Sequence, residues 1–482
     1  MKRLYTIFAL AAALMLAGGC KQAAEPYPMF WTWLEDIPSI DMESAFTHME
    51  EAGLDAVMLH AASVEDYIKD VEIARRHGIR VWAWVWTLNP PRQERPQMLE
   101  EHPDWFSVNR NGESVKTFKA YVNSYKFLCP ALPEVRDYLK EKVKTICEID
   151  GVEGICLDYC RLIDCVLPIS LAYNYNLRQD TEVWSEYDFG YHPAMIEKFV
   201  AQYGYDPRTL EDPSRDERWC QFRCDQVTEV ANMMAEVAHS YGKTVSASPF
   251  SAAGVAKFMV FQEWGKWDLD MVFPMNYTDF YTMDKSFAYD ATVENNKAKG
   301  PNTTLFCGID TELGGDPATT LAKMDEAFRA GAQGISLYTI EGLDTPELRA
   351  GFKAYADSLR ALRKANGGVV PFTPAEAANM DPFANEGLMA VVRRNIQRVA
   401  AGEAIHEKSV NGMVKDDPAK VYPDLELGDF ELVRQTDRLL EYKVTDAESG
   451  QSFKVLFITY GNVISGWDVR PLADTEPLPL KR

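Results

Sequence analysis

The sequence predicts an α/β protein: a (β/α)8 barrel of the TIM type, followed by a small C-terminal α+β domain. Eight short apolar runs alternate with helical stretches along the chain. Most of these runs lack a regular alternation of apolar and polar residues, as expected for parallel strands that are buried on both faces. No glycine-rich phosphate loop follows the first run, although an open doubly wound sheet would usually have one. Together these observations favour a closed barrel.

The predicted strands cover residues 28–33, 56–60, 80–86, 152–158, 244–248, 271–275, 304–309 and 334–338. Several of the helices between them end at a glycine, which is the usual C-terminal stop of a helix. A helix over residues 61–76 is followed by Gly78, and one over residues 226–240 is followed by Gly242. The sequence therefore repeats a strand–helix unit with marked helix ends.

Two connections between predicted elements are unusually long. Residues 88–132 follow the third strand, and residues 159–218 follow the fourth. Both begin where a strand ends, and this is the face of a barrel that carries active sites. Long connections at such a place usually form functional walls or lids.

Residues 366–482 are predicted to form an accessory domain that follows a barrel domain over residues 27–365. The glycines at the start of this part indicate a linker, and residues 385–401 have the apolar periodicity of one amphipathic helix. Four β-rich runs then predict an antiparallel meander over residues 429–433, 439–445, 452–460 and 463–469. Nothing in this part has a catalytic pattern.

Residues 1–20 are predicted to be a signal peptide rather than part of the fold. A positively charged start precedes an apolar run over residues 5–16, which is too short to span a bilayer comfortably. Small residues then precede Cys20, as in bacterial lipoprotein signals, although Ala17 stands where leucine is usual. We expect Cys20 to be lipidated and the mature protein to be exported and anchored in the cell envelope, at the outer membrane or the cell surface. Ordinary signal cleavage is the alternative.

The chain has 482 residues and a formal net charge of −22. Its length is too great for one compact core, so two domains are expected. The acidity argues against nucleic acid as a partner. It also makes a strongly anionic polymer a less natural substrate, although a local basic cleft could override the average. The alternative is that the acidity serves solubility alone.

Eight cysteines remain after Cys20, and five of them lie close together in the sequence: Cys156, Cys160, Cys165, Cys220 and Cys224. No Cys-x-x-Cys pair with matching histidines occurs, and neither does a His-Glu-x-x-His motif. The sequence therefore predicts no metal site, and it gives no sign of a cofactor. Buried free thiols or one disulfide are the expectation.

Side chains at the C-terminal ends of the predicted strands are the candidate site residues, because these ends face the active site of a barrel. They are Trp31, Trp33, Glu35, His60, Trp84, Trp86, Asn89, Asp158, Tyr159, Arg161, Asp164, Ser248, Asn276, Tyr277, Asp279, Asp310, Glu312, Tyr338 and Glu341. Carboxylates from several strands suit the cleavage of a glycosidic bond, which needs an acid and an opposing base or nucleophile. Tryptophan and tyrosine rings suit the apolar faces of sugars.

Asp158 is the strongest catalytic candidate. It ends an apolar run, where a bare carboxylate is costly unless it is paired or used. Arg161 lies three residues later and could lower the pKa of Asp158 or clamp a substrate oxygen. The structural alternative is that Asp158 forms an ion pair that organises the loop.

The second carboxylate is left open between residues that follow later strands. Asp310 and Glu312 follow the seventh strand, Glu341 follows the eighth, and Asp279 follows the sixth. We favour Glu312 slightly, with Asp310 next, and expect at least two of the four to be ordinary polar loop residues.

Candidate contacts to a carbohydrate substrate are Trp31, Trp33, His60, Trp86, Asn276, Tyr338 and Glu341. The tryptophans of residues 80–86 share one face of their strand, so they could instead fill the core. His60 could equally satisfy only a strand end.

Several segments resemble the glycosyl-hydrolase-like family-10 barrel proteins of bacteria. CPALPEVRDYL (129–139) is similar to a lead-in helix, and VEGICLDYCR (152–161) to the family's fourth strand. YGYDP (203–207), the helix that carries Trp219 and Arg223, and DMVFPMNY (270–277) add to the likeness. The resemblance covers residues 28–345. It implies a barrel with a glycan-cleaving role, Asp158 in the catalytic site, and Tyr159, Arg161, Arg223 and Tyr277 as its neighbours.

Two features qualify this resemblance. Leu162 and Ile163 replace the Tyr-Pro that usually follows the arginine in that family, which puts the geometry of the loop in doubt. Chitinase-like barrels would place their acid at Cys160, so that chemistry is argued against. The sequence thus leaves two main hypotheses, a glycoside hydrolase and a non-catalytic glycan-binding lipoprotein. A barrel lyase or aldolase ranks lower, because no predicted strand ends in lysine.

Overall fold

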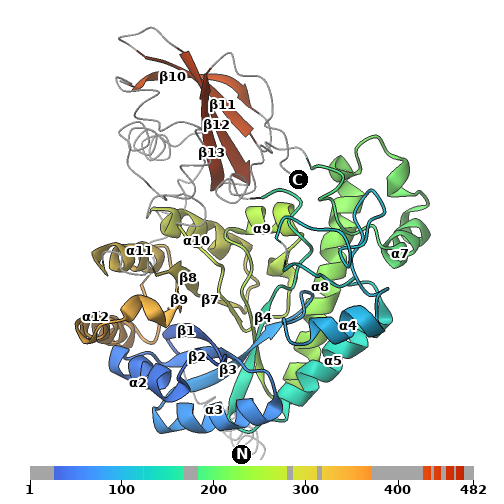
Figure 1. Cartoon of the computed structure of the whole chain (residues 1–482). Helices are drawn as coiled ribbons and strands as arrows, with labels where there is room; N and C mark the ends of the chain where they lie inside the picture. The colour runs from blue at the N-terminus through green and yellow to red at the C-terminus, as the bar shows by residue number, and fades with distance from the viewer. Residues whose placement is uncertain are drawn as a thin grey trace, which may run out of the picture.

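Parallel strands form a ring at the centre of the computed structural model, and helices surround it (Figure 1). The structure describes residues 27–122, 124–167, 183–278, 286–311 and 317–371, together with four strands between residues 427 and 471. The barrel strands are β1 (Phe30–Glu35), β2 (Ala56–His60), β3 (Arg80–Trp86), β4 (Val152–Asp158), β5 (Thr244–Ala247), β6 (Met271–Val272), β7 (Thr304–Leu305), β8 (Cys307–Asp310) and β9 (Ile335–Tyr338). The predicted (β/α)8 architecture is confirmed.

The ring closes through one strand that is split in two. The hydrogen-bonded order is β7-β6-β5-β4-β3-β2-β1-β9-β8, and β7 and β8 are successive halves of one segment that is interrupted at Phe306. The first half pairs with β6 and the second with β9. A parallel bridge between Met275 and Gly308 joins the two sides. Nine short strands thus occupy the eight positions that the sequence predicts.

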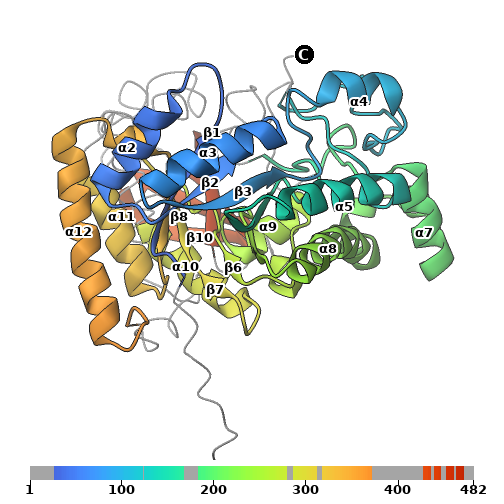
Figure 2. The same ribbon diagram turned by 90° about the horizontal axis from the view of Figure 1, so that it is seen from below.

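The helices are α2 (Met42–Ala52), α3 (Val64–Arg76), α4 (Arg95–Glu101), α5 (Pro133–Cys147), α7 (Pro193–Tyr203), α8 (Glu217–Ser240), α9 (Ala253–Val260), α10 (Ser286–Ala298), α11 (Pro317–Arg329) and α12 (Pro346–Ala365). Short 3-10 turns occur at η1 (Pro207–Thr209), η2 (Pro213–Arg215), η3 (Trp264–Lys266) and η4 (Ile340–Leu343). Viewed from below, α2, α3, α5, α8 and α12 lie around the outside of the ring (Figure 2).

Polar caps fix where several helices begin. Asp41 accepts a hydrogen bond from the second residue of α2, and Ser63 accepts one from Asp66 in the first turn of α3. Asp216 caps α8 in the same way, so this helix starts nine residues before the predicted residue 226. Gly53 ends α2 with a φ of 68°, a left-handed conformation that favours glycine.

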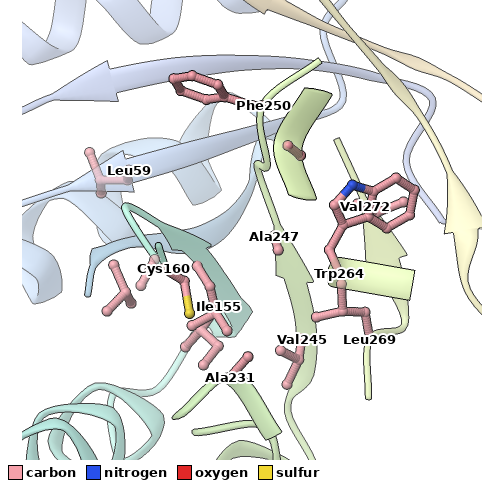
Figure 3. Close-up of a cluster of buried hydrophobic side chains, with 14 of the residues drawn as sticks. Leu59, Ile155, Cys160, Ala231, Val245, Ala247, Phe250, Trp264, Leu269 and Val272 are labelled. Carbon is pink, nitrogen blue, oxygen red and sulfur yellow. The ribbon is translucent and has the colours of Figure 1, made fainter. Parts of the chain in front are cut away.

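Alternate residues of the strands face the lumen and the helices. On β3, Val81, Ala83 and Val85 pack outward, whereas the tryptophans of this strand point inward. Figure 3 shows part of the outer layer, where Val245 and Ala247 of β5 lie among side chains of neighbouring elements. The question that the sequence left open is thereby answered, since the tryptophan face of β3 is the lumen.

Large aromatic rings fill the lower lumen. The ring centroid of Trp31 lies 4.6 Å from that of Trp82 and 5.0 Å from that of Phe273, which stacks on Phe306 at 4.5 Å. Edge-to-face and stacked rings at these distances pack tightly. The lower lumen is therefore filled by these side chains.

A second sheet contains β10 (Leu427–Gln435), β11 (Leu439–Asp446), β12 (Ser452–Tyr460) and β13 (Val463–Pro471). These strands pair antiparallel in chain order, so the predicted meander is confirmed. β12 and β13 contact α9, and β13 also contacts α10 (Figure 1). The predicted helix over residues 385–401 lies outside the described residues.

All eight cysteines after Cys20 are free thiols, and only Cys220 is not fully buried. This matches one of the two expectations, buried thiols rather than a disulfide. Cys20 and the predicted signal peptide lie outside the described residues. Within the described part of the chain, no helix has both the length and the apolar character to cross a membrane.

Candidate active site

A cavity of about 390 Å³ lies at the C-terminal ends of the barrel strands. It is lined by Trp33, Glu35, Trp84, Trp86, Arg92, Tyr125, Asp158, Tyr159, Arg161, Phe250, Met275, Tyr277 and Tyr338. A mostly aromatic wall with a few convergent polar groups is typical of a site for a small molecule or one unit of a polymer.

Asp158 is fixed in one orientation within this cavity. It projects into the lumen because it shares the inner face of β4 with Cys156. The indole Nε1–H of Trp84 donates to Oδ2 of Asp158 at 2.9 Å, and the backbone N–H of Tyr159 donates to Oδ1 at 2.6 Å. Tyr159 has a φ of 51°, in the left-handed region that bulky residues rarely adopt. Such conformations concentrate at functional sites.

The surroundings of Asp158 favour its protonated form. Burial raises the pKa of its carboxyl group above the ordinary value. The hydrogen bonds from Trp84 and Tyr159 and the charge of Arg161 act in the opposite direction without cancelling this effect. A carboxyl group that keeps its proton longer is suited to donate it to a leaving group.

Glu35 is a second acidic side chain in the cavity. It ends β1 and follows Trp33 on the inner face of that strand. Its side chain is half-buried and lines the cavity. No described residue forms a hydrogen bond or an ion pair with its carboxylate, so the group is available to a ligand. Among the described residues that line the cavity, Glu35 and Asp158 are the two acids.

Arg161 is buried beneath the wall rather than free to bind an anion. It pairs with Asp164 at 2.9 Å, and its other terminal nitrogen donates to the hydroxyl of Tyr125 at 3.0 Å. Burial alone would lower its pKa, but Asp164, Tyr125 and Tyr159 together outweigh burial and raise it. Its guanidinium lies over four aromatic rings, those of Tyr125, Phe127, Tyr159 and Phe250. Arg161 therefore holds the aromatic rings of the wall in place. Its charge is neutralised by Asp164.

His60 supports the wall from behind. Its ring stacks on Trp86 with centroids 5.4 Å apart and planes at 19°. Nδ1 lies 3.2 Å from the carbonyl oxygen of Trp84, and Nε2 accepts from the amide of Gln93 at 3.1 Å. Burial, followed by the charge of Lys142, lowers the pKa of His60 to about 4. The imidazole is thus neutral near pH 7 and lies outside the cavity lining.

Tyr277 and Tyr338 form another part of the wall. Their rings stack with centroids 5.4 Å apart and planes at 23°. Tyr338 is 44% exposed, so one flat ring face stays accessible. Together with Trp33 and Trp86 these tyrosines provide the kind of surface on which a sugar ring can stack.

A family model described as glycosyl hydrolase-like 10 matches residues 43–320, which is more than half of the chain. The chain belongs to the glycosyl hydrolase-like 10 family. The resemblance inferred from the sequence motifs is therefore confirmed. No curated protein matches the sequence.

Three solved structures to which the chain is similar are the following. The GH36 α-galactosidase AgaA from Geobacillus stearothermophilus is 10% identical with a TM-score of 0.37. The match covers 91% of this chain and 48% of the galactosidase chain. The glycoside hydrolase domain of PelA from Pseudomonas aeruginosa is 10% identical with a TM-score of 0.35, at coverages of 66% and 96%. A D-allulose 3-epimerase from Methylomonas sp. is 8% identical with a TM-score of 0.37, at 70% and 98%.

These likenesses concern the fold only. This chain spans about half the length of the galactosidase. A fold does not by itself imply a function, so the function of this glycosyl hydrolase-like 10 member depends on the residues of its own site.

Several predicted site residues of this family member lie away from the cavity. Trp31 belongs to the solid lower lumen, where its Nε1–H donates to the carbonyl of Pro28 at 2.8 Å. Arg223 is buried in an ion pair with Asp188 at 2.5 Å and lies over the ring of Phe261. Neither lines the cavity, so both have structural surroundings.

Polar residues at the later strand ends are also engaged elsewhere. Asn276 is buried and bonds to Ser251 and Thr292. Oδ1 of Asp310 accepts from the backbone of Thr278 at 3.2 Å and pairs with the buried Lys323 at 3.3 Å.

Glu341 accepts a hydrogen bond from Thr339 on the surface. Asn276, Asp310 and Glu341 do not line the cavity, while Asp279 and Glu312 lie outside the described residues.

Four lining residues were not among the sequence candidates. Arg92 and Tyr125 come from the β3–α5 connection, Phe250 follows β5, and Met275 follows β6. The length of the long connection gave the signal for Arg92 and Tyr125, since it predicted a wall at this face. Its course supports that prediction, because the backbone of Gly190 and Tyr191 bonds to Val108 and joins the two long connections.

Within the described residues, no group of three His, Cys, Asp or Glu side chains is arranged to hold a metal ion.

Proposed function

We propose that this protein is a glycoside hydrolase whose catalytic pair is Asp158 and Glu35. One observation carries the proposal: the two acids come from separate strands, β4 and β1, and line the same aromatic-walled cavity. Cleavage of a glycosidic bond by this class of enzyme needs two carboxyl groups that flank the bond. Family membership agrees with this activity.

Asp158 takes the role of general acid. Its raised pKa keeps a proton available, and Trp84 and Tyr159 hold its oxygens in place. As the bond between the anomeric carbon and the leaving oxygen breaks, this proton passes to the leaving oxygen. Glu35 acts on the other side of the sugar, either as the nucleophile or as the base that takes a proton from the attacking water.

The aromatic wall positions the sugar. The rings of Trp33, Trp86 and Tyr338 offer apolar faces to the C–H faces of a pyranose, while few hydrogen-bonding groups compete for it. Correct positioning of the bond between two carboxyl groups contributes a large share of the rate in such a site.

The test uses Asp158→Asn and Glu35→Gln, with Asp150→Asn as the matched control. Asp150 is exposed and lies just before β4, at the opposite end of the same strand. On a panel of plant, host and bacterial glycans, we expect each cavity variant to lower kcat by about 10²–10⁴-fold while binding is retained. The control should match the unmodified protein. Full activity of either cavity variant would refute the assignment of that residue.

Binding of glycans without cleavage by the unmodified protein would instead support the alternative, a glycan-binding protein without catalysis. This outcome is distinguishable because the Asp158→Asn variant would then bind the same glycans with the same affinity. In that case the unmodified protein and the Asp158→Asn variant would also give the same result in every product assay.

We also propose that the protein is exported and anchored by a lipid on Cys20. Support comes from the short apolar run and the small residues before Cys20. Mass spectrometry of the mature N-terminus should find a diacylglyceryl group on Cys20. Replacement Cys20→Ala should release the protein from the membrane fraction.

A further inference from the structure

Three basic side chains lie together at the part of the wall made by the β3–α5 connection: Arg92, Arg95 and Lys126. Arg92 lines the cavity and is exposed. Arg95 is buried, and its Nε donates to the carbonyl of Pro90 at 2.6 Å. Lys126 is half-buried, and its Nζ donates to the backbone carbonyl of Val115 at 2.6 Å.

The charges of these three residues are not neutralised by the described part of the chain. No described carboxylate forms an ion pair with any of them. Other basic residues of the same region do have such partners, since Arg161 pairs with Asp164, and Lys142 pairs with Glu94 at 2.9 Å. A positive wall next to the cavity results.

The three cations also influence one another. Burial lowers the pKa of Arg95 and of Lys126. For Arg95, Tyr159 acts in the opposite direction, while the neighbouring cation Arg92 lowers the pKa further. For Lys126, the neighbouring cation Arg95 lowers the pKa further. The protein thus maintains like charges close together at a cost that an incoming anion would relieve.

This wall contrasts with the rest of the molecule. The chain has 72 acidic and 50 basic residues, so an unpaired basic cluster does not follow from its composition. A local field of one sign beside a low-dielectric cleft attracts ligands of the opposite sign even when the net charge repels them.

We propose that the glycan of this cavity carries an anionic substituent, a carboxylate or a sulfate, which the guanidinium of Arg92 receives. This inference rests on the proposed function, because it assumes that a sugar occupies the cavity. A planar guanidinium can form two parallel hydrogen bonds with either group. Arg95 and Lys126 do not line the cavity, and their charges add attraction without direct contact.

The experiment compares anionic sugars with their neutral counterparts. The probes are uronate oligosaccharides, the same oligosaccharides after reduction of their carboxyl groups, and sulfated oligosaccharides. The proteins are the unmodified chain, Arg92→Gln, Arg92→Lys and the control Arg75→Gln, which removes an equal charge from an exposed position at the end of α3.

We expect the unmodified protein to prefer an anionic sugar to its neutral counterpart. Arg92→Gln should raise KM for the anionic sugar about tenfold, with little change for the neutral one. Arg92→Lys should recover part of the preference, and higher ionic strength should weaken it. Arg75→Gln should behave as the unmodified protein. Which anionic probe shows the effect tells a carboxylate from a sulfate.

Direct binding separates this inference from the proposed function. Calorimetric titration of the Asp158→Asn variant with the same probes requires no catalysis. If the protein prefers anionic probes in binding but the unmodified protein cleaves none of them, the proposed hydrolase activity is refuted and the inference stands. Cleavage with equal affinity for anionic and neutral probes, or an Arg92→Gln variant that keeps the preference, would overturn the inference and keep the hydrolase.

Discussion

Asp70 and His60 are buried ionisable side chains whose neutral forms the fold favours. Burial, followed by the charge of Asp36, raises the pKa of Asp70 to about 7. No N–H or hydroxyl group of the described residues donates to Asp70, and the carboxyl group of Asp36 lies within hydrogen-bonding reach of it. Burial lowers the pKa of His60 to about 4. Their effects on stability run in opposite directions with pH.

Replacement Asp70→Asn should stabilise the protein at alkaline pH. A raised carboxyl pKa gives a contribution that is present below about pH 4 and is lost as pH rises through about 7. The full loss is on the order of 4 kcal/mol, from roughly three pKa units. The variant cannot ionise, so its Tm should exceed that of the unmodified protein at pH 8 and approach it at pH 5. Equal differences at both pH values would contradict this explanation.

Replacement His60→Asn should reduce acid sensitivity. The lowered pKa of His60 gives a contribution that is present above about pH 6.5 and is lost as pH falls through about 4. Between pH 7 and pH 5 the unmodified protein should lose about 2 kcal/mol that the variant does not lose. Denaturant unfolding at the two pH values measures this. The asparagine amide can still donate to the carbonyl of Trp84, so a parallel loss in both proteins would refute the role of titration.

Replacement Trp84→Phe should move the alkaline limb of the pH–rate profile to higher pH. The indole N–H stabilises the ionised form of Asp158, so its removal raises the pKa of the carboxyl group further. An acid that must be protonated then stays active over a wider range. The dependence of kcat/KM on pH measures the shift. A limb that moves to lower pH would contradict the assignment of Asp158 as the acid.

At the scale of elements, the strands were readable from the sequence because their apolar runs are bounded by helix stops. β2, β3 and β4 have the predicted bounds, whereas β6 retains only two residues. Beyond Val272 the backbone pairs with its neighbours through single β-bridges instead of a continuous ladder of hydrogen bonds. The apolar pattern of a sequence does not distinguish a bridge from a ladder.

The site was only partly readable. Trp33, Trp86 and Asp158 lie where strand-end reasoning put them, because alternation along a strand fixes which side chains enter the lumen. Arg92 belongs to a connection without periodicity, so nothing in the sequence placed it. Glu35 was a strand-end candidate, but only the cavity distinguishes it from the carboxylate of Asp310, which Lys323 occupies.

The ion pair of Arg223 and Asp188 anchors the long connections to α8. Both side chains are buried, and the backbone carbonyl of Asp188 accepts from Arg110 at 2.8 Å. Replacement Asp188→Asn should destabilise the protein by about 3 kcal/mol, because it leaves a buried cation without its partner. Thermal unfolding measures the effect. The double variant Asp188→Leu with Arg223→Met should lose less, and a loss as large as that of the single variant would contradict this reasoning.

At the scale of the whole molecule, the barrel closes without the C-terminal sheet. β9 pairs with both β1 and β8, and α12 packs against α2. The last contacts of this part reach Val370, whose backbone N–H donates to Gln333 at 2.8 Å. All barrel strands are thus paired before the sheet of β10–β13 begins, and from that sheet Val444 of β11 packs against the hydrophobic core.

A chain of residues 27–371 should therefore fold. We expect it to retain the circular dichroism of the barrel and a cooperative thermal transition, and to bind glycans within a few-fold of the full chain. It would lose the contacts of β12 and β13 with α9. An insoluble product or a non-cooperative transition would show that the sheet is an integral part of the barrel fold.

If the protein is exported as proposed, its free thiols affect how long it stays intact. Burial raises the pKa of six of them to about 11 or 12, so reactive thiolate is scarce while the chain is folded. Unfolding in an oxidising compartment would expose all eight sulfur atoms at once and allow random cross-links. The lifetime of the protein would then depend on its rate of unfolding. Thermal unfolding would be irreversible unless a reductant were present.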